Sequence, residues 1–311
     1  MKRGFRFIKP STRAFFREGK KAGNVRLLDA VHGYIYGRWI YQYIGIGTGE
    51  HWLAKLFLPL AGIFHRLGKP FRKENGKSFA DTYHGKVVSL EGARELVTVN
   101  QPVRILDLEQ VIPYARARDI ILLNPDHIVV LDCPCRSARP TPCSPLDVCL
   151  VIGEPFASFV HEHHPGRSRR ISQQDALDIL AAEHKRGHVH HAFFKEAMLN
   201  RFYAICNCCS CCCGAIQAMR NGVPMLASSG FVAQVDQSLC VHCGRCATHC
   251  QFDALFKDGE QVHFDESKCL GCGVCVDVCR KGARRMEAAP DRGVPLEIRR
   301  LTTFSNQESW Q

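Results

Sequence analysis

The sequence has no long uninterrupted apolar run, which disfavours a membrane-spanning helix. Residues 25–71 are apolar and aromatic, but no part of them reaches the 18 consecutive apolar residues expected of a span. Arg38, Lys55 and Pro59 interrupt the segment. The basic segment 1–16 also has no apolar core of the kind found in secretory signals. We therefore expect a cytoplasmic protein without a transmembrane span.

Motifs for nucleotide chemistry are missing as well. No G-x-G-x-x-G follows an expected strand, and neither a P-loop nor a nucleophile elbow occurs. No groove-reading or base-stacking motif accompanies the basic charge, so nucleic acid is not expected as a partner. No pair of residues that could act as general acid and general base can be picked out from the sequence, so the catalytic residues stay unknown. The isolated histidines receive no catalytic role: His190, His191, His242 and His249.

Acidic residues are outnumbered, with 30 Asp and Glu against 41 Lys and Arg and a net charge of +11. Residues 1–26 hold nine Lys and Arg and only one acid, Glu18. This excess of positive charge has two possible explanations. The segment is either a flexible basic leader, or a docking site for an acidic partner or an anionic lipid surface. A second basic group would guide acidic redox partners: Arg280, Lys281, Arg284 and Arg285.

Cysteine, by contrast, is abundant, with 18 residues. Eight of them form two copies of C-x2-C-x2-C-x3-C, which begin 29 residues apart at Cys240 and Cys269. This is the spacing that holds [4Fe–4S] clusters in bacterial-type ferredoxins. Three thiolates bind three corners of one cluster, and the fourth cysteine reaches the other cluster. The predicted ligands are therefore crossed: Cys240, Cys243, Cys246 and Cys279 for one cluster, and Cys269, Cys272, Cys275 and Cys250 for the other.

Residues 231–290 resemble a two-cluster, bacterial-type ferredoxin domain. "CVHCGRC" and "CLGCGVC" contain glycines suited to tight turns, and "ALFKDGEQVHF" has the alternation and Asp-Gly turn of a hairpin. Strands at 232–235 and 284–287 would complete a pseudo-twofold βαβ repeat. One departure concerns the proline that usually follows the fourth cysteine. Gln251 and Arg280 stand in its place.

Ten further cysteines lie upstream of this domain. A secreted disulfide framework is disfavoured, because such frameworks belong to short chains with signal peptides. A zinc site and a third iron–sulfur cluster both stay open. Neighbouring side chains diverge, so the cysteines of "CNCCSCCCG" cannot all bind one ion. The candidate ligands, with the subset undecided, are Cys133, Cys135, Cys143, Cys149, Cys206, Cys208, Cys209, Cys211, Cys212 and Cys213.

The whole arrangement, "CPCR" and "CNCCSCCCG" followed by a dicluster domain, resembles a widespread group of prokaryotic 4Fe–4S-binding proteins. "VHGYIYGRW" and "ADTYHGKVV" share this resemblance. It implies electron transfer, as a low-potential carrier or a subunit of a redox complex. Two alternatives stay open. One is an oxidoreductase whose substrate-reducing cluster lies in residues 133–213, and the other is an iron–sulfur redox sensor.

We expect an α+β fold in which a cysteine-rich α/β domain joins an N-terminal helical segment to a ferredoxin-like dicluster domain. Aromatic residues within 1–67 either pack on the protein's own core or touch a membrane surface. The expected parts are a flexible basic leader at 1–24, an aromatic helical segment at 25–84, the cysteine-rich domain at 85–230, the dicluster domain at 231–290 and a tail at 291–311.

Local signals predict several elements of the cysteine-rich domain. Ser172 begins a capping-box pattern, which predicts a helix that ends at Gly187. A further helical stretch is expected up to Tyr203, and another helix is expected to begin at Gly214. Residues 85–131 are predicted to form short strands and turns, with "ILLNPDHIVVLD" as a buried strand that ends before a cysteine pair.

Overall fold

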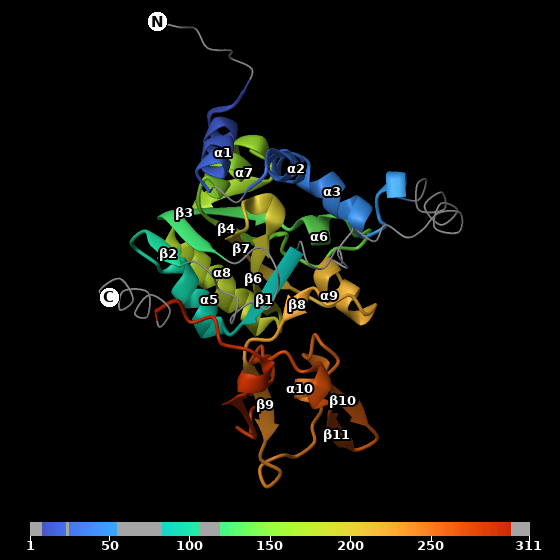
Figure 1. Cartoon of the computed structure of the whole chain (residues 1–311). Helices are drawn as coiled ribbons and strands as arrows, with labels where there is room; N and C mark the ends of the chain where they lie inside the picture. The colour runs from blue at the N-terminus through green and yellow to red at the C-terminus, as the bar shows by residue number, and fades with distance from the viewer. Residues whose placement is uncertain (1–7, 23–24, 55–82, 106–118, 300–311) are drawn as a thin grey trace, which may run out of the picture.

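The computed structural model describes residues 8–22, 25–54, 83–105 and 119–299. Helices and strands are mixed, and Figure 1 shows a larger body above a smaller C-terminal lobe. We call residues 231–288 the lobe, and the described residues outside it the body. The chain returns to the body after the lobe, since Leu296 and Ile298 are buried in the body core.

The body is built on one eight-stranded sheet with the order β2-β3-β4-β7-β6-β1-β8, in which β5 pairs with β3. The pairs are antiparallel except for β1 with β8. The strands are β1 (Tyr83–Val88), β2 (Val103–Ile105), β3 (Ile120–Asp132), β4 (Asp147–Glu154), β5 (Ser168–Ile171), β6 (Val189–Lys195), β7 (Arg201–Cys208) and β8 (Leu226–Ala227).

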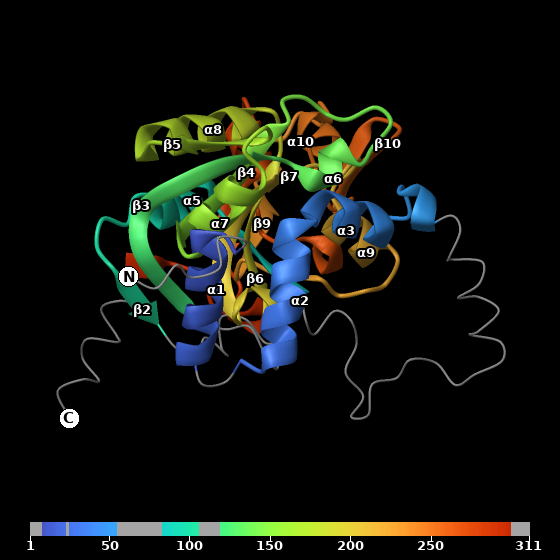
Figure 2. The same ribbon diagram turned by 90° about the horizontal axis from the view of Figure 1, so that it is seen from above.

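Helices cover both faces of this sheet (Figure 2). Successive residues of β3 alternate between the faces, because strand side chains point to opposite sides. Val129 belongs to the core on one side and Ile128 to the core on the other. The first side carries α1 (Pro10–Lys21), α2 (Leu27–Arg38) and α7 (Phe156–His163), and the second carries α5 (Leu90–Val97) and α8 (Gln173–Lys185).

The segment from His188 to Tyr203 is not helical, so that prediction is wrong. It forms β6, a short 3-10 turn at Glu196–Met198 and the first part of β7. Every residue of β6 is buried, because this strand lies inside the sheet between β7 and β1. A strand covered on both faces reads as a continuous apolar run and loses the alternation that marks a half-exposed strand. Helix α5 was also missed, although Ser89 caps its N-terminus by accepting a hydrogen bond from Gly92 N–H at 3.1 Å.

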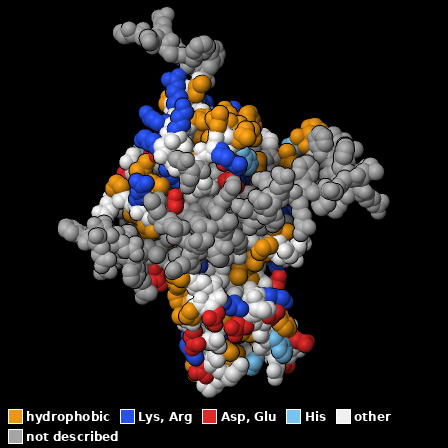
Figure 3. Space-filling view, in the orientation of Figure 1, with side chains coloured by type: hydrophobic (Ala, Val, Ile, Leu, Met, Phe, Trp, Pro, Cys, Tyr) orange, Lys and Arg blue, Asp and Glu red, His pale blue; other side chains and the backbone are white. Residues whose placement is uncertain are grey.

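The basic leader is helical over Pro10–Lys21, so the expectation of a flexible segment is wrong for these residues. Phe15 is fully buried in the core beside α7. Ser11 N–H donates to a carboxylate oxygen of Glu162 at 2.9 Å, and Thr12 Oγ1 lies 2.9 Å from His163 Nε2. Figure 3 shows Lys and Arg side chains gathered over α1 on the outer surface.

The aromatic segment forms α2 and α3 (Ile40–Gly47), which are separated at Trp39, and α3 ends in a turn at 48–51. Tyr36 is buried in the body core, whereas Trp52 is two-thirds exposed. Tyr41 Oη donates to the Asp132 carbonyl at 3.0 Å. Within the described residues, no helix combines the length and the apolar character needed to cross a bilayer. Residues 55–71 of the apolar and aromatic segment lie outside the described residues.

The remaining local predictions are confirmed. Ser172 and Asp175 form the capping box of α8, and α9 (Gly214–Arg220) begins where expected. In the lobe the predicted hairpin and the outer strand pair are both present. The lobe elements are β9 (Phe231–Val235), α10 (Arg245–Thr248), β10 (Leu255–Asp258), β11 (Gln261–Phe264), a 3-10 turn at Glu266–Lys268, α11 (Val274–Asp277) and β12 (Arg284–Ala288).

Candidate metal centres

The first cysteine motif of the lobe surrounds a cavity of about 380 Å³. Gly244 has a left-handed φ of 80° and turns the chain from the cysteine loop into α10. The fourth cysteine on the wall comes from the second motif. The cysteines that line the cavity are Cys240, Cys243, Cys246 and Cys279.

The second motif gathers its three cysteines with Cys250 of the first. Burial raises the pKa of Cys272 well above its usual value, and the nearby thiols of Cys275, Cys250 and Cys269 raise it further. Burial, followed by Cys269, raises the pKa of Cys275 to about 12. Four thiols this close cannot all ionise unless a cation is bound, and metal coordination deprotonates a thiol outright. The group therefore has the chemistry of a site for a thiophilic metal or an iron–sulfur cluster.

The backbone approaches the second motif closely at Gly271. Its φ is 70°, and a Cβ atom there would lie 2.1 Å from the Phe231 carbonyl oxygen. The Ser229 side chain donates to the Gly271 carbonyl at 2.7 Å. Only glycine fits this position, so the small residue in "CLGCGVC" is required by packing as well as by the turn.

The ten upstream cysteines separate into two groups. Six of them form the buried cysteine group: Cys133, Cys135, Cys149, Cys206, Cys208 and Cys213. They line a small cavity of about 50 Å³, whose wall Cys209 and Cys212 complete. The thiols form hydrogen bonds with one another: Cys133 with Cys135 and Cys149, Cys149 with Cys206, and Cys208 with Cys213.

His191 adds a nitrogen donor to the buried cysteine group. It is fully buried on β6, and apart from the Cys213 thiol neither ring nitrogen has a hydrogen-bond partner among the described residues. One ring nitrogen of His191 and the sulfurs of Cys208 and Cys213 lie within 4.8 Å of one another. A hydrogen bond with Cys208, with a further contribution from His191, lowers the pKa of Cys213 to about 5 despite burial. A buried imidazole whose only neighbours of this kind are two thiols fits a metal ligand.

The other four cysteines form what we call the surface cysteine group: Cys143, Cys209, Cys211 and Cys212. Their sulfur atoms all lie within 4.8 Å of one another. The first comes from the loop between α6 (Pro134–Ser137) and β4, and the other three from the loop between β7 and α9. All 18 cysteines of the protein are free thiols in the structure.

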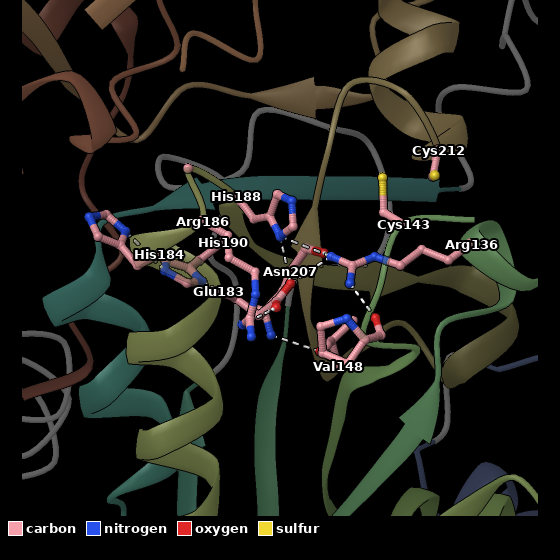
Figure 4. A network of polar contacts seen from close by, with 12 residues as sticks. Arg136, Cys143, Val148, Glu183, His184, Arg186, His188, His190, Asn207 and Cys212 are labelled. Atoms are coloured by element: carbon pink, nitrogen blue, oxygen red, sulfur yellow. Dashed lines mark hydrogen bonds and ion pairs between the residues drawn. The ribbon is translucent and has the colours of Figure 1, made fainter. Parts of the chain in front are cut away.

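A buried arginine holds the cysteine-bearing segments together (Figure 4). Arg136 follows Cys135 in α6 and is 1% exposed. Its guanidinium donates to the Pro145 carbonyl at 2.5 Å, to the Asn207 carbonyl at 3.1 Å and to Glu183 Oε2 at 2.6 Å. Pro145 lies in the loop that carries Cys143, Asn207 lies between Cys206 and Cys208, and Glu183 lies on α8. One side chain therefore fixes three segments that carry or support cysteines.

A chain of hydrogen bonds joins this network to the lobe. Asn207 Nδ2 donates to the Val148 carbonyl at 2.7 Å, and its Oδ1 lies 2.6 Å from His190 Nδ1. His190 Nε2 is 3.2 Å from His184 Nδ1, and His184 Nε2 is 2.5 Å from a carboxylate oxygen of Asp277. Asp277 lies between two cysteines of the second motif. His190, which received no catalytic role from the sequence, and His184 thus connect the second motif to the centre of the body.

Gln251, which stands where ferredoxins usually have proline, makes a second connection. Its Oε1 accepts from Ser210 N–H at 2.7 Å, and its Nε2 donates to the Gly187 carbonyl at 2.8 Å. Proline could make neither bond. The departure from the usual motif is therefore explained by the contact between the lobe and the loop of the surface cysteine group. His242, in the first motif, instead accepts a hydrogen bond from Val262 N–H at 3.1 Å.

Comparison with known proteins agrees with the geometry of the lobe. Residues 233–286 match the family described as 4Fe-4S dicluster domain. No curated protein matches the chain. This part of the chain is similar to ferredoxin-like dicluster domains, and the match, together with the clustered cysteines, supports an iron–sulfur electron-transfer role. The upstream cysteine-rich motif has no family match.

Several residues of the candidate site were missed by sequence reasoning. Arg136 and Asn207 stand within "CPCR" and "CNCCSCCCG" and Glu183 within no motif, but the role of all three was missed because their partners come from distant segments. His191 carried a weak signal. It precedes Phe193 by two residues in "HHAFF", and both side chains belong to the same face of a strand. Recognising β6 as a strand would have placed His191 and Phe193 on the same face, but the prediction of a helix concealed this relation.

Proposed function

We propose that this protein is an iron–sulfur electron-transfer protein whose lobe holds two [4Fe–4S] clusters. The crossed grouping of the eight lobe cysteines carries the proposal. Cys279 lines the cavity of the first motif, and Cys250 lies among the thiols of the second. This exchange of the fourth cysteine is the arrangement that the two-cluster spacing requires. The assignment of individual ligands is part of the proposal.

Bound [4Fe–4S] clusters would supply one-electron transfer at a potential set by burial, local charge and hydrogen bonds to sulfur. The chain provides such hydrogen bonds from its backbone. The N–H of Ala247 lies against the Cys246 sulfur, and the N–H of Val274 against that of Cys272. Burial excludes water from Cys275, whereas Cys243 is exposed. The two sites therefore differ in solvation, which supports two distinct potentials.

The second motif faces the body. Val274 belongs to the body core, and Leu270 and Cys272 pack against it. Ser229 N–H also donates to the Leu270 carbonyl at 3.0 Å. The first motif has an exposed cysteine and an open cavity instead. We assign the first motif to exchange with an external partner and the second to exchange with the cysteine-rich body.

Basic side chains frame the exposed side of the first motif. Arg245, Arg280 and Lys281 are exposed on the wall of its cavity. Arg284 lies on the same wall but is buried. Positive charge at this rim supports docking of an acidic redox protein, because complementary charge speeds diffusional encounter.

Reversing two of these charges should slow reduction by a small acidic redox protein. We expect Arg280→Glu with Lys281→Glu to lower the bimolecular rate about tenfold or more at low ionic strength, because attraction becomes repulsion. The difference should shrink as salt is added, since screening removes long-range steering. Stopped-flow reduction at several salt concentrations measures it.

The matched control places the same charge change on α1. Arg17→Glu with Lys20→Glu alters two exposed cations at the other end of the molecule. This variant should keep the rate of the unmodified protein. A slow α1 variant beside a normal Arg280 and Lys281 variant would move the dock to the N-terminal helix and contradict the proposal.

Iron content tests the function directly. The full chain, purified without air, should be brown and contain about eight irons and as many sulfides in the lobe, the content of two cubanes. Reduction with dithionite should bleach the colour, and one-electron acceptors should restore it. Colourless folded protein that cannot be loaded with iron and sulfide would end the proposal.

A further inference from the structure

The surface cysteine group brings four sulfur atoms together in a small volume. Cys143 Sγ lies 2.9 Å from Cys211 Sγ, and Cys211 Sγ lies 3.7 Å from Cys212 Sγ. With Cys209 included, every pair of sulfurs is within 4.8 Å. The group lies at the surface, since Cys211 is exposed and Cys143 half-buried, while the other two are buried. This is an open-faced, preformed set of four soft ligands.

From this geometry we infer that the surface cysteine group is a separate site for one thiophilic divalent metal ion, Zn²⁺ or Fe²⁺. A metal–sulfur bond of about 2.3 Å in a tetrahedron places the sulfurs about 3.8 Å apart. The distances of 2.9 and 3.7 Å lie below this value, and no pair of sulfurs in the group is more than 4.8 Å apart. Thiolates on a cubane bind outward from its corners and are held much further apart, so the group is too compact for a [4Fe–4S] cluster.

Disulfides do not account for the group. A disulfide needs a sulfur–sulfur distance of about 2.05 Å and a specific dihedral angle. The sulfurs of Cys143 and Cys211 are 2.9 Å apart. Cys211 and Cys212 are adjacent in sequence, where a bridge is strained. A pairwise account would also leave unexplained why four thiols from two loops meet at one point.

Both loops are held in place independently of the metal. Arg136 binds the Pro145 carbonyl and fixes the loop of Cys143. Arg139 donates to the Cys212 carbonyl at 3.2 Å and to Gln217 at 2.5 Å. Its guanidinium also forms an ion pair with Glu50, which fixes its position beside the site. Gln217 in turn donates to the Cys211 carbonyl at 3.0 Å.

The site has a structural consequence for the lobe. Ser210 lies between Cys209 and Cys211, and its N–H donates to Gln251 beside Cys250. A metal ion that binds both neighbours of Ser210 would fix the direction of this N–H group. It would thus set the contact by which the lobe's second motif rests on the body. The role inferred is a structural clip, apart from the electron-transfer sites.

Metal analysis of two single variants of the full chain tests the inference. Cys143→Ala should lose one equivalent of zinc, or of iron outside clusters, while the cluster iron and sulfide stay unchanged. Cys243→Ala is the matched control, an exposed cysteine in the lobe. It should lose about four irons, one cubane, and keep the metal of the surface group. The two losses should therefore be independent.

Spectroscopy on the unmodified protein provides the second measurement, which needs no variant to fold. X-ray absorption at the zinc edge should report four sulfur neighbours at about 2.3 Å. If the ion is iron, Mössbauer spectra should contain one high-spin tetrahedral iron beside the cluster signals. Either result supports the inference and identifies the metal.

Two results would overturn it. One is a Cys143→Ala variant that loses about four irons and their sulfide, which would make the group part of a cubane. The other is unmodified protein without zinc or lone iron in which all four thiols react with an alkylating reagent. Both outcomes leave the lobe clusters as they are, so the proposed function is tested separately.

Discussion

Replacing Cys272 with alanine is expected to halve the iron of the lobe, from about eight atoms per chain to about four. Cys272 lies among the crowded thiols of the second motif and packs against the body core. Without this thiolate one iron corner has no protein ligand, and the cluster is lost. Alanine is preferable to serine, whose oxygen can replace the sulfur. Iron and sulfide analysis of anaerobic protein gives the result.

The same series tests the crossed assignment. Cys250→Ala should lose the cluster lost in Cys272→Ala, and Cys279→Ala should lose the one lost in Cys243→Ala. Paramagnetic resonance of the reduced variants should sort the four into these two pairs by the spectrum of the remaining cluster. A Cys250→Ala spectrum like that of Cys243→Ala would contradict the exchange of the fourth cysteine and favour two self-contained motifs.

Replacing Glu183 with alanine is expected to lower the free energy of unfolding by about 3–5 kcal/mol, the cost of breaking a buried ion pair. Both Glu183 and Arg136 are almost fully buried, with the carboxylate 2.6 Å from the guanidinium. Burial alone would raise the pKa of Glu183, but hydrogen bonds from His188 and Arg136 outweigh it and hold the pKa below its usual value. The charge of Arg136 would be left uncompensated. Denaturant unfolding of the anaerobic protein measures the change.

Two controls separate the ion pair from other effects. Asp178→Ala, on the exposed side of the same helix, should change stability by no more than about 0.5 kcal/mol. Arg136→Met combined with Glu183→Leu removes both charges and should be less destabilising than Glu183→Ala. A Glu183→Ala variant as stable as the Asp178→Ala variant would show that the network does not hold the cysteine segments.

The lobe could be predicted because its information is local. Each motif places three cysteines within seven residues, and the hairpin and outer strands have their own short signals. The capping box of α8 at Ser172 and the start of α9 at Gly214 are local in the same way. Such signals depend on hydrogen bonds between residues three or four apart, so they survive without knowledge of the fold.

The division of the upstream cysteines could not be predicted. Cys211 and Cys213 are two residues apart in sequence, yet one belongs to the surface group and the other to the buried group. The turn in which Cys213 N–H bonds to the Cys209 carbonyl at 3.0 Å separates them. Burial of β6 on both faces similarly concealed a strand and, with it, His191.

By itself, the sequence determined that the protein has the thiols for two clusters, because ligand spacing within a loop is a property of the chain. Only the tertiary structure decided which cysteines meet upstream, that Arg136 and Glu183 join them, and that Gln251 and Asp277 tie the second motif to the body. These contacts join residues from about 40 to more than 90 positions apart. Such distant partners come together only when the sheet has assembled and buried them, and no local pattern encodes that.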